Sequence, residues 1–314
     1  MLTWLTGWSD PFYQNYFWLV TSLIALIGLA LICLRAFPKT KEASEKVWVS
    51  FSPWLIMVPL IFLATGLGRE VFIVSLLFLS IFCVKEFARA TGLYEDWGFM
   101  LAVYLGILGF YASIAVKWYG LFMAMPVYTI VILLMIPALR NEYKGMIQKV
   151  GLSNIAIIYI GWFPAHLAFI GDHQYGYAYI LFLIIGTELN DASAYLTGKM
   201  FGKRPLVPNI SPKKTVEGAL GSLLLTSLYV WFVHRWLPGF NLYLLILSVI
   251  ILWVGGTMGD LVMSFVKRDI GIKDMGKLIP GHGGLLDRVD SLIFVSPLFF
   301  HMVNHYVKFP GGLQ

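Results

Sequence analysis

The sequence has little charge and little cysteine, and each scarcity excludes a class of protein. Only 13% of its 314 residues are charged, against about 25% in a typical soluble domain. Its two cysteines, Cys33 and Cys83, both lie in apolar runs and fit neither a disulfide framework nor a zinc site. By contrast, 59% of the residues are hydrophobic, and the mean hydropathy is +0.77. These values predict an integral membrane protein and exclude a soluble enzyme.

Apolar runs of about 20 residues, the length that crosses the hydrocarbon core of a bilayer, recur along the chain. The predicted fold class is all-α, a polytopic transmembrane helical bundle of about ten spans. The predicted spans are Tyr16–Ala36, Trp48–Gly66, Val71–Ala90, Phe99–Val116, Leu121–Leu139, Asn154–Gly171, Tyr177–Thr197, Ala219–Leu237, Leu242–Val266 and Ser291–Val307. The charged segment Lys39–Lys46 between the first two is predicted to be a solvated connecting loop.

The distribution of basic residues predicts the orientation, because Lys and Arg favour the cytoplasmic side of a membrane. With the N-terminus outside and strict alternation of spans, only four of the 23 Lys and Arg lie on the outer side. These four are Arg69, Lys117, Arg235 and Lys308. The asymmetry predicts an even number of spans and places the charged motifs of the second half at the cytoplasmic surface.

Two carboxylates stand at the cytoplasmic end of the seventh predicted span. Glu188 and Asp191 are three residues apart, so on a helix they share one face. A carboxylate near the middle of a membrane costs about 2.5–3.5 kcal/mol on insertion scales. Two of them together indicate a polar cavity, a cation or a basic partner. The alternative is an interhelical hydrogen bond that only fastens the bundle.

The next segment, Gly198 to Gly218, contains several prolines that exclude a continuous helix. Gly198 and Gly202 are spaced for close helix packing. Hydroxyl and ammonium groups suited to phosphate follow at Ser211, Lys213, Lys214 and Thr215. Thr215 is also predicted to cap the next helix. The alternative is an ordinary basic loop of a membrane protein.

The most polar segment runs from Ser264 to Asp290, directly after an apolar run that contains Asp260. It gathers charges of both signs around glycines, which let the backbone approach a ligand closely. Asp287 and Asp290 are three residues apart at the predicted start of the last span. Carboxylates suit Mg²⁺, which binds through one or two of them plus substrate phosphates, and basic side chains neutralise phosphate. The pattern predicts anion chemistry at the membrane surface, and a salt-bridged loop is the alternative.

These motifs also carry a family resemblance. The segment Ser264–Asp290 reads S-x-V-K-R-x4-K-D-x-G-x2-I-P-x-H-G-G-L-x-D-R-V-D, and D-x-x-A-Y-x-x-G, F-G-K, S-P-x-K-T and G-D-L precede it in that order. Together they resemble the phosphatidate cytidylyltransferases (CDP-diacylglycerol synthases), over roughly Glu188 to Ser291. The first half of the chain is similar only as a set of apolar spans. Asn190 and Val216 depart from the family pattern and could bear on substrate preference.

The resemblance implies a nucleotidyltransferase, usually a homodimer, that joins phosphatidate to the CMP portion of CTP and releases pyrophosphate. It implies Mg²⁺ on Asp260 and Asp287 and an active site that opens to the cytoplasm and to the lipid, here of a bacterial inner membrane. No nucleic-acid partner is expected. We therefore divide the chain into N-terminal spans, residues 1–151, and a catalytic transmembrane region with cytoplasmic motif loops, residues 152–314.

Roles for the other polar residues of these motifs follow as hypotheses from the chemistry. Asp191 is a candidate for binding a second cation or for orienting a lysine. The further catalytic candidates are Lys214, Lys267 and Arg268, and the substrate-binding candidates are Asp191, Ser211, Lys213, Thr215, Lys273, Asp274, His282, Gly283, Gly284, Arg288 and Asp290.

Other functions stay open at this point. Basic loops and intramembrane carboxylates also mark the paths of transporters for phosphorylated anions. The paired broken spans expected of two repeated transporter halves are not visible, however. A CTP-dependent lipid kinase, or a cytidylyltransferase for another lipid phosphate, would share the same basic and acidic residues. A CDP-alcohol phosphotransferase would need an aspartate-rich DG-x2-AR type motif that the sequence lacks.

Overall fold

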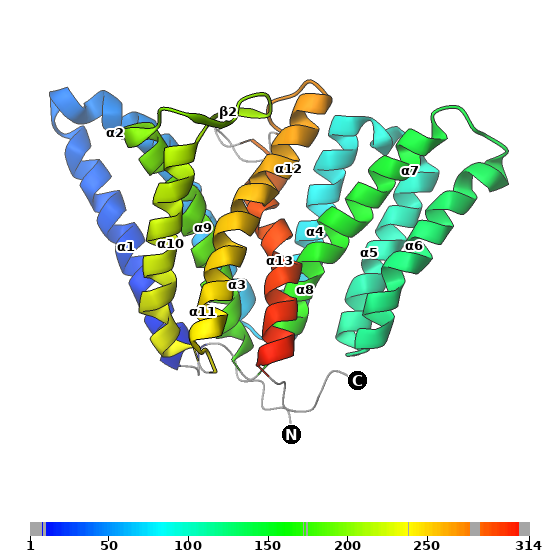
Figure 1. Cartoon of the computed structure of the whole chain (residues 1–314), viewed down its shortest axis with the longest axis horizontal. Coiled ribbons are helices and arrows are strands. Elements are labelled where there is room, and N and C mark those ends of the chain that lie inside the picture. The colour runs from blue at the N-terminus through cyan, green and yellow to red at the C-terminus, as the bar shows by residue number, and fades with distance from the viewer. Residues whose placement is uncertain are drawn as a thin grey trace.

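The fold is a bundle of long helices with one short hairpin at its end (Figure 1). The structure, a computed structural model, describes Trp8 and residues 11–171, 173, 175–237, 239–276 and 283–307. The helices before residue 171 are α1 (Pro11–Arg35), α2 (Pro38–Phe51), α3 (Trp54–Gly66), α4 (Arg69–Thr91), η2 (Leu93–Glu95), α5 (Trp97–Ala115), α6 (Tyr119–Arg140), α7 (Met146–Asn154), η3 (Ile155–Trp162) and α8 (Phe163–Ile170). The later elements are α9 (Gly176–Phe201), β1 (Pro205–Val207), β2 (Ser211–Thr215), α10 (Val216–Val233), η4 (His234–Trp236), α11 (Leu242–Ile250), η5 (Ile251–Gly255), α12 (Gly256–Asp269) and α13 (Leu286–Tyr306).

Many of these helices are long enough to span a membrane. Seven helical segments within the described residues are long and apolar enough to cross a bilayer, judged by length and composition. In Figure 1 they run side by side, and the start of α1 and the end of α13 lie at the same, lower end. The predicted helical membrane bundle is thus confirmed. The number of about ten spans stays a prediction, since α3 has only 13 residues and α9 and α13 carry charged side chains.

The prediction for the segment after α1 was wrong. Residues Lys39–Lys46 are not a loop but part of helix α2, which has Pro38 at its first position, where proline favours helix initiation. The Ser44 hydroxyl donates to the Leu31 carbonyl at 2.7 Å and fastens α2 to α1. The predicted span Trp48–Gly66 is likewise two helices, because the chain breaks at Ser52 and Pro53 before α3 begins.

The proline-rich segment after α9 forms a β-hairpin instead of an irregular loop. Strands β1 and β2 pair antiparallel, with Pro205 opposite Thr215 and Val207 opposite Ser211. Figure 1 shows β2 at the upper end of the bundle, beside the end of α12. Because Thr215 ends β2 and caps α10, its hydroxyl accepts a hydrogen bond from Gly218 N at 3.1 Å, as predicted. The hairpin therefore starts the next helix in a fixed orientation.

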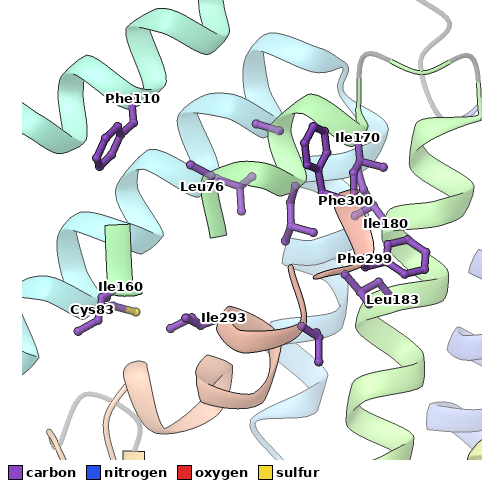
Figure 2. Close-up of a cluster of buried hydrophobic side chains, with 14 of the residues drawn as sticks. Leu76, Cys83, Phe110, Ile160, Ile170, Ile180, Leu183, Ile293, Phe299 and Phe300 are labelled. Carbon is purple, nitrogen blue, oxygen red and sulfur yellow. The ribbon is translucent and has the colours of Figure 1, made fainter. Parts of the chain in front are cut away.

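The buried core lies where α4, α8, α9 and α13 meet (Figure 2). Phe299 and Phe300 of α13 and Leu183 of α9 have no exposed surface. Outward-facing apolar side chains are common on α1, where Leu26 is 66% exposed. Surface of this kind is normal against lipid and would be an aggregation liability in water. The core thus fixes α13 against helices from both halves of the chain.

Two helices contain π-helical turns. Segment η3 joins α7 to α8, and η5 joins α11 to α12. In a π-helix the hydrogen bonds run from i to i+5, which adds a residue to the turn, and such turns are frequent at functional sites. Tyr159 in η3 lies next to the start of α12, and its hydroxyl donates to the Gly259 carbonyl at 3.5 Å.

Asp96 ties three helices together beyond the membrane-spanning segments. Its side chain caps α5 and forms ion pairs with Arg140 of α6 at 2.9 Å and Lys149 of α7 at 2.7 Å. Burial raises the pKa of the Asp96 carboxyl, but the hydrogen bonds from the two cations outweigh it, so the pKa lies below its usual value.

Candidate active site

Close packing of α9 and α10 places the hairpin over the membrane helices. A side-chain carbon at Gly218 would lie 2.7 Å from the backbone oxygen of Ala194, and one at Gly198 would lie 2.9 Å from the Thr215 hydroxyl. One at Gly202 would lie 2.2 Å from the Gly198 carbonyl oxygen of the same helix and 2.8 Å from the Thr215 side chain. The predicted close helix packing is thus confirmed at Gly198, which lies against Gly218 of α10, whereas Gly202 lies against the end of the hairpin. Glycine thus lets β2 sit directly against α9.

Two polar cavities are lined by the described motif residues. The larger, with a volume of about 550 Å³, lies between the hairpin and the helices α9, α10 and α12. It holds the four predicted phosphate-binding residues of the hairpin, together with carboxylates from α9 and α12. The polar residues that line it are Asp191, Tyr195, Lys199, Ser211, Lys213, Lys214, Thr215, Thr257 and Asp260. Three lysines make this cavity the more basic of the two.

The smaller cavity, of about 230 Å³, is acidic. Six carboxylates line it, and within its described lining they face one lysine and one arginine. Its lining residues are Trp54, Met57, Glu188, Asp191, Asp260, Lys267, Asp274, Asp287, Arg288 and Asp290. Asp191 and Asp260 belong to both cavities. The two hollows therefore adjoin at these two carboxylates.

Two ion pairs hold the central aspartates. Lys214 Nζ lies 2.7 Å from Asp260 Oδ2, and Ser264 Oγ donates to Asp260 Oδ1 at 3.1 Å. Lys267 Nζ lies 2.8 Å from Asp287 Oδ1. The Asp260 side chain is 32% exposed and that of Asp287 only 4%. The Lys214–Asp260 pair is therefore accessible to a ligand, whereas the Lys267–Asp287 pair is mostly buried in the lining of the acidic cavity.

The structure brings most of the predicted site residues to these two cavities, but not all of them. Arg268 and Lys273 are exposed and line neither cavity. The Arg268 Nε instead donates to the Ile210 carbonyl at 3.3 Å, in the turn of the hairpin. His282 lies outside the described residues. The backbone of Gly283 has φ +83°, a conformation that favours glycine, and its neighbour Gly284 donates to Asp287.

Asn190 is not among the residues that line either cavity. It is fully buried, and its Oδ1 accepts a hydrogen bond from the Thr226 hydroxyl of α10 at 3.3 Å. Its position ties α9 to α10 inside the bundle.

The acidic cavity fits a divalent cation by its chemistry. Within the described residues no three His, Cys, Asp or Glu side chains are arranged as ligands of one ion. Mg²⁺ does not need such a set, because it binds through one or two carboxylates and takes its other oxygens from substrate phosphates and water. Asp260 and Asp287 face the same cavity, whose lining is strongly negative.

Three side chains at the site come from a part of the chain that the motifs did not indicate. Trp54 and Met57 of α3 line the acidic cavity. Glu86 of α4 accepts a hydrogen bond from Leu286 N at 2.9 Å, at the start of α13. No local pattern marks them, since each meets the site only through contacts with residues far along the chain. The sequence did contain one indirect signal, which is that Glu86 is a carboxylate within the predicted span Val71–Ala90.

Residues 48–306 of the chain match the cytidylyltransferase family. The chain belongs to the cytidylyltransferase family. The match begins in α2, so it takes in most of the N-terminal half as well as the motif-bearing second half. The family model thus extends well beyond the segment that carries the recognisable motifs.

Curated relatives of this cytidylyltransferase family member include proteins named phosphatidate cytidylyltransferase. One from Staphylococcus haemolyticus is 42% identical over 161 residues, which are 51% of this chain and 60% of the relative. One from Staphylococcus aureus is 41% identical over the same shares. An uncharacterized protein of Escherichia coli, YnbB, is 40% identical over 164 residues, 49% of this chain and 55% of that protein. The matches thus cover a little over half the length of these relatives.

Proposed function

We propose that this protein is a phosphatidate cytidylyltransferase, which converts CTP and phosphatidate to CDP-diacylglycerol and pyrophosphate. The observation that carries the proposal is the pair of adjoining cavities, one basic and one acidic, that share Asp191 and Asp260. A reaction between two phosphorylated molecules is favoured by cationic groups that neutralise their phosphates and by carboxylates that would hold a divalent metal ion. The names of the relatives point to the same substrates.

The proposed step is an in-line displacement at the α-phosphorus of CTP. An oxygen of the lipid phosphate forms the new P–O bond, and the bond from the α-phosphorus to the bridging oxygen breaks. That oxygen leaves with the electron pair as part of pyrophosphate. A phosphate monoester is largely ionised at pH 7, so no strong general base is required. In-line geometry places nucleophile and leaving group on opposite sides, which two adjoining cavities allow.

The chain's own contribution is positioning and charge. Lys214 and Lys267 pair with Asp260 and Asp287, and both ammonium groups are placed to turn to phosphate oxygens when substrates enter. Arg288 lines the acidic cavity, and its buried Nε has no hydrogen-bond partner within the part of the chain that the structure describes, so it is available to a phosphate oxygen. Ser211 and Thr215 line the basic cavity.

Asp260 and Asp287 would hold Mg²⁺. When bound there, the ion would neutralise charge on the phosphates of CTP and so stabilise the transition state. Asp191, which borders both cavities, remains the candidate for a second cation or for orienting Lys214.

The test is an assay of purified protein in detergent with Mg²⁺ and CTP labelled at the α-phosphate. Phosphatidate and a panel of other lipid phosphates are offered in parallel. We expect labelled lipid and one pyrophosphate for each labelled lipid. A CTP-dependent kinase would instead release CDP and leave the lipid without the label. The absence of labelled lipid with every lipid phosphate would refute the proposal.

The orientation and assembly belong to the same proposal. We place the hairpin end of the bundle at the cytoplasmic face of a bacterial inner membrane, as the basic residues favour, and expect a homodimer. Single cysteines introduced at Lys199 and at Arg235 would report the sides. A membrane-impermeant thiol reagent added to intact cells should label only the second. The dimer is measured by cross-linking in native membranes.

A further inference from the structure

Glu86 joins the N-terminal half of the chain to the last helix. It lies near the cytoplasmic end of α4, and its Oε2 accepts a hydrogen bond from Leu286 N, the first residue of α13. A carboxylate at this place satisfies a free N–H and is stabilised by the helix dipole. Its second oxygen, Oε1, is buried and has no hydrogen-bond partner among the described residues. A buried carboxylate oxygen without a partner is unfavourable, so the contact calls for a reason beyond stability.

The carboxylate also lies against two glycines. A side-chain carbon at Gly276 would lie 2.5 Å from Glu86 Oε1, and its three nearest atoms would all belong to Glu86. One at Gly284 would lie 2.5 Å from Glu86 Oε2 and 2.8 Å from Gly276 N. Real side-chain carbons do not approach this closely. The two segments thus meet at Glu86, and only glycine leaves room for its carboxylate.

Asp287 holds the same two segments from the other side. Its Oδ2 accepts hydrogen bonds from Met275 N and Gly284 N, both at 2.9 Å. Its Oδ1 is left to Lys267 and to the acidic cavity. The orientation of the Asp287 carboxylate therefore depends on where these backbone N–H groups lie.

We propose that Glu86 is a positioning residue that sets the orientation of Asp287 from the opposite half of the chain. It accepts a hydrogen bond from the first turn of α13, and its carboxylate packs against Gly276 and Gly284. The inference rests on the proposed function, because it gives Glu86 a part in the same reaction. It also gives α4 a role in the site, beyond that of a membrane anchor.

The first test compares two substitutions with different losses. Glu86→Ala removes the packing against the two glycines and the acceptor, and we expect activity to fall about 10- to 100-fold, the usual effect of losing a group that orients a metal ligand. Glu86→Gln keeps the volume and an acceptor for Leu286 N, so we expect less than about a threefold loss. The matched control is Glu95→Gln, at an exposed carboxylate just beyond α4, with unchanged activity.

A second test uses the steric contact. Gly276→Ala should lower activity in the natural protein, because its methyl group meets the Glu86 side chain. In the Glu86→Ala background the same change should cause no further loss. Neighbouring residues that act through one contact show such non-additivity, whereas independent residues multiply their effects.

Hydrogen exchange supplies a readout that does not depend on activity. In Glu86→Ala the amides of Met275, Gly284 and Leu286 should exchange faster than in the natural protein, and in Glu86→Gln they should not. An equal loss of activity in Glu86→Gln and Glu86→Ala would overturn the inference, since it would make the charge itself catalytic. So would multiplicative losses in the double variant, or unchanged exchange. If the natural protein makes no labelled lipid at all, the proposed function fails, and the exchange result still decides the contact.

Discussion

Asp260 allows the sharpest test of the site, because its structural and chemical roles differ in size. Its ion pair with Lys214 is partly open, with side chains 32% and 22% exposed. Exposed pairs contribute about 0.2–1 kcal/mol to stability. Asp260→Asn keeps the shape and one acceptor for Ser264, so we expect the free energy of unfolding to fall by no more than about 1 kcal/mol.

The expected effect on catalysis is much larger. A carboxylate that would hold a catalytic Mg²⁺ contributes several kcal/mol of transition-state stabilisation. A loss of about 4 kcal/mol corresponds to about a 1,000-fold slower reaction. We therefore expect Asp260→Asn to form almost no CDP-lipid while it keeps a melting temperature within a few degrees of the natural protein.

The assay measures labelled lipid and the thermal transition on the same preparation. The control is Asp269→Asn, which removes an exposed carboxylate from the end of the same helix, outside both cavity linings. It should match the natural protein in both measurements. Near-normal turnover by Asp260→Asn would refute the metal role, and a large loss of stability would show that we have misjudged how open the ion pair is.

Three further predictions follow from other contacts. Asp287→Asn should lower both activity and stability. We expect the free energy of unfolding to fall by about 3–5 kcal/mol, because the substitution leaves the nearly buried ammonium group of Lys267 without its counter-charge. Asp96→Asn should lower stability at pH 7 by about 1 kcal/mol by removing the pairs with Arg140 and Lys149. The pKa of Asp96 is lower in the folded protein, so this deficit is present above about pH 4 and vanishes as the pH falls further. Gly218→Ala should raise the KM for CTP and the lipid, because its methyl group pushes α10 and the hairpin away from α9.

Each of these has a result that would count against it. Equal melting temperatures for the Asp287 variant and the natural protein would mean that the pair is more solvated than its geometry indicates. A stability deficit in the Asp96 variant that is the same at pH 3 and pH 7 would show that its ionised form is not the stabilising one. Unchanged KM values in the Gly218 variant would mean that the hairpin adapts without cost. Thermal unfolding across pH and steady-state kinetics are sufficient to measure them.

Much of the site was predictable because its signals are local. Spacings of three residues put Glu188 and Asp191 on one helix face, and the same holds for Asp287 and Asp290. The cap at Thr215 and the end of the helix before the prolines depend only on neighbouring residues. Such patterns survive without knowledge of the fold, so the main residues of both cavities could be named from the sequence.

Other features were decided by packing. The charged segment Lys39–Lys46 is helical because α2 is fastened to α1, a contact that no local pattern indicated. Arg268 is in the middle of a motif, yet its side chain lies outside both cavities, because its position at the end of α12 brings it to the hairpin turn. A linear motif states which residues are close in the chain, and the direction of each side chain depends on the helix that carries it.

The amino-acid sequence alone determined that this protein is a helical membrane protein with basic and acidic motifs in its second half, because hydrophobic length and residue spacing act locally. Only the tertiary structure decided that two cavities adjoin at Asp191 and Asp260, and that Glu86 reaches the start of α13. Those contacts join residues as much as 200 positions apart. They exist only where helices pack at one particular depth and rotation, and that information is spread over the whole bundle.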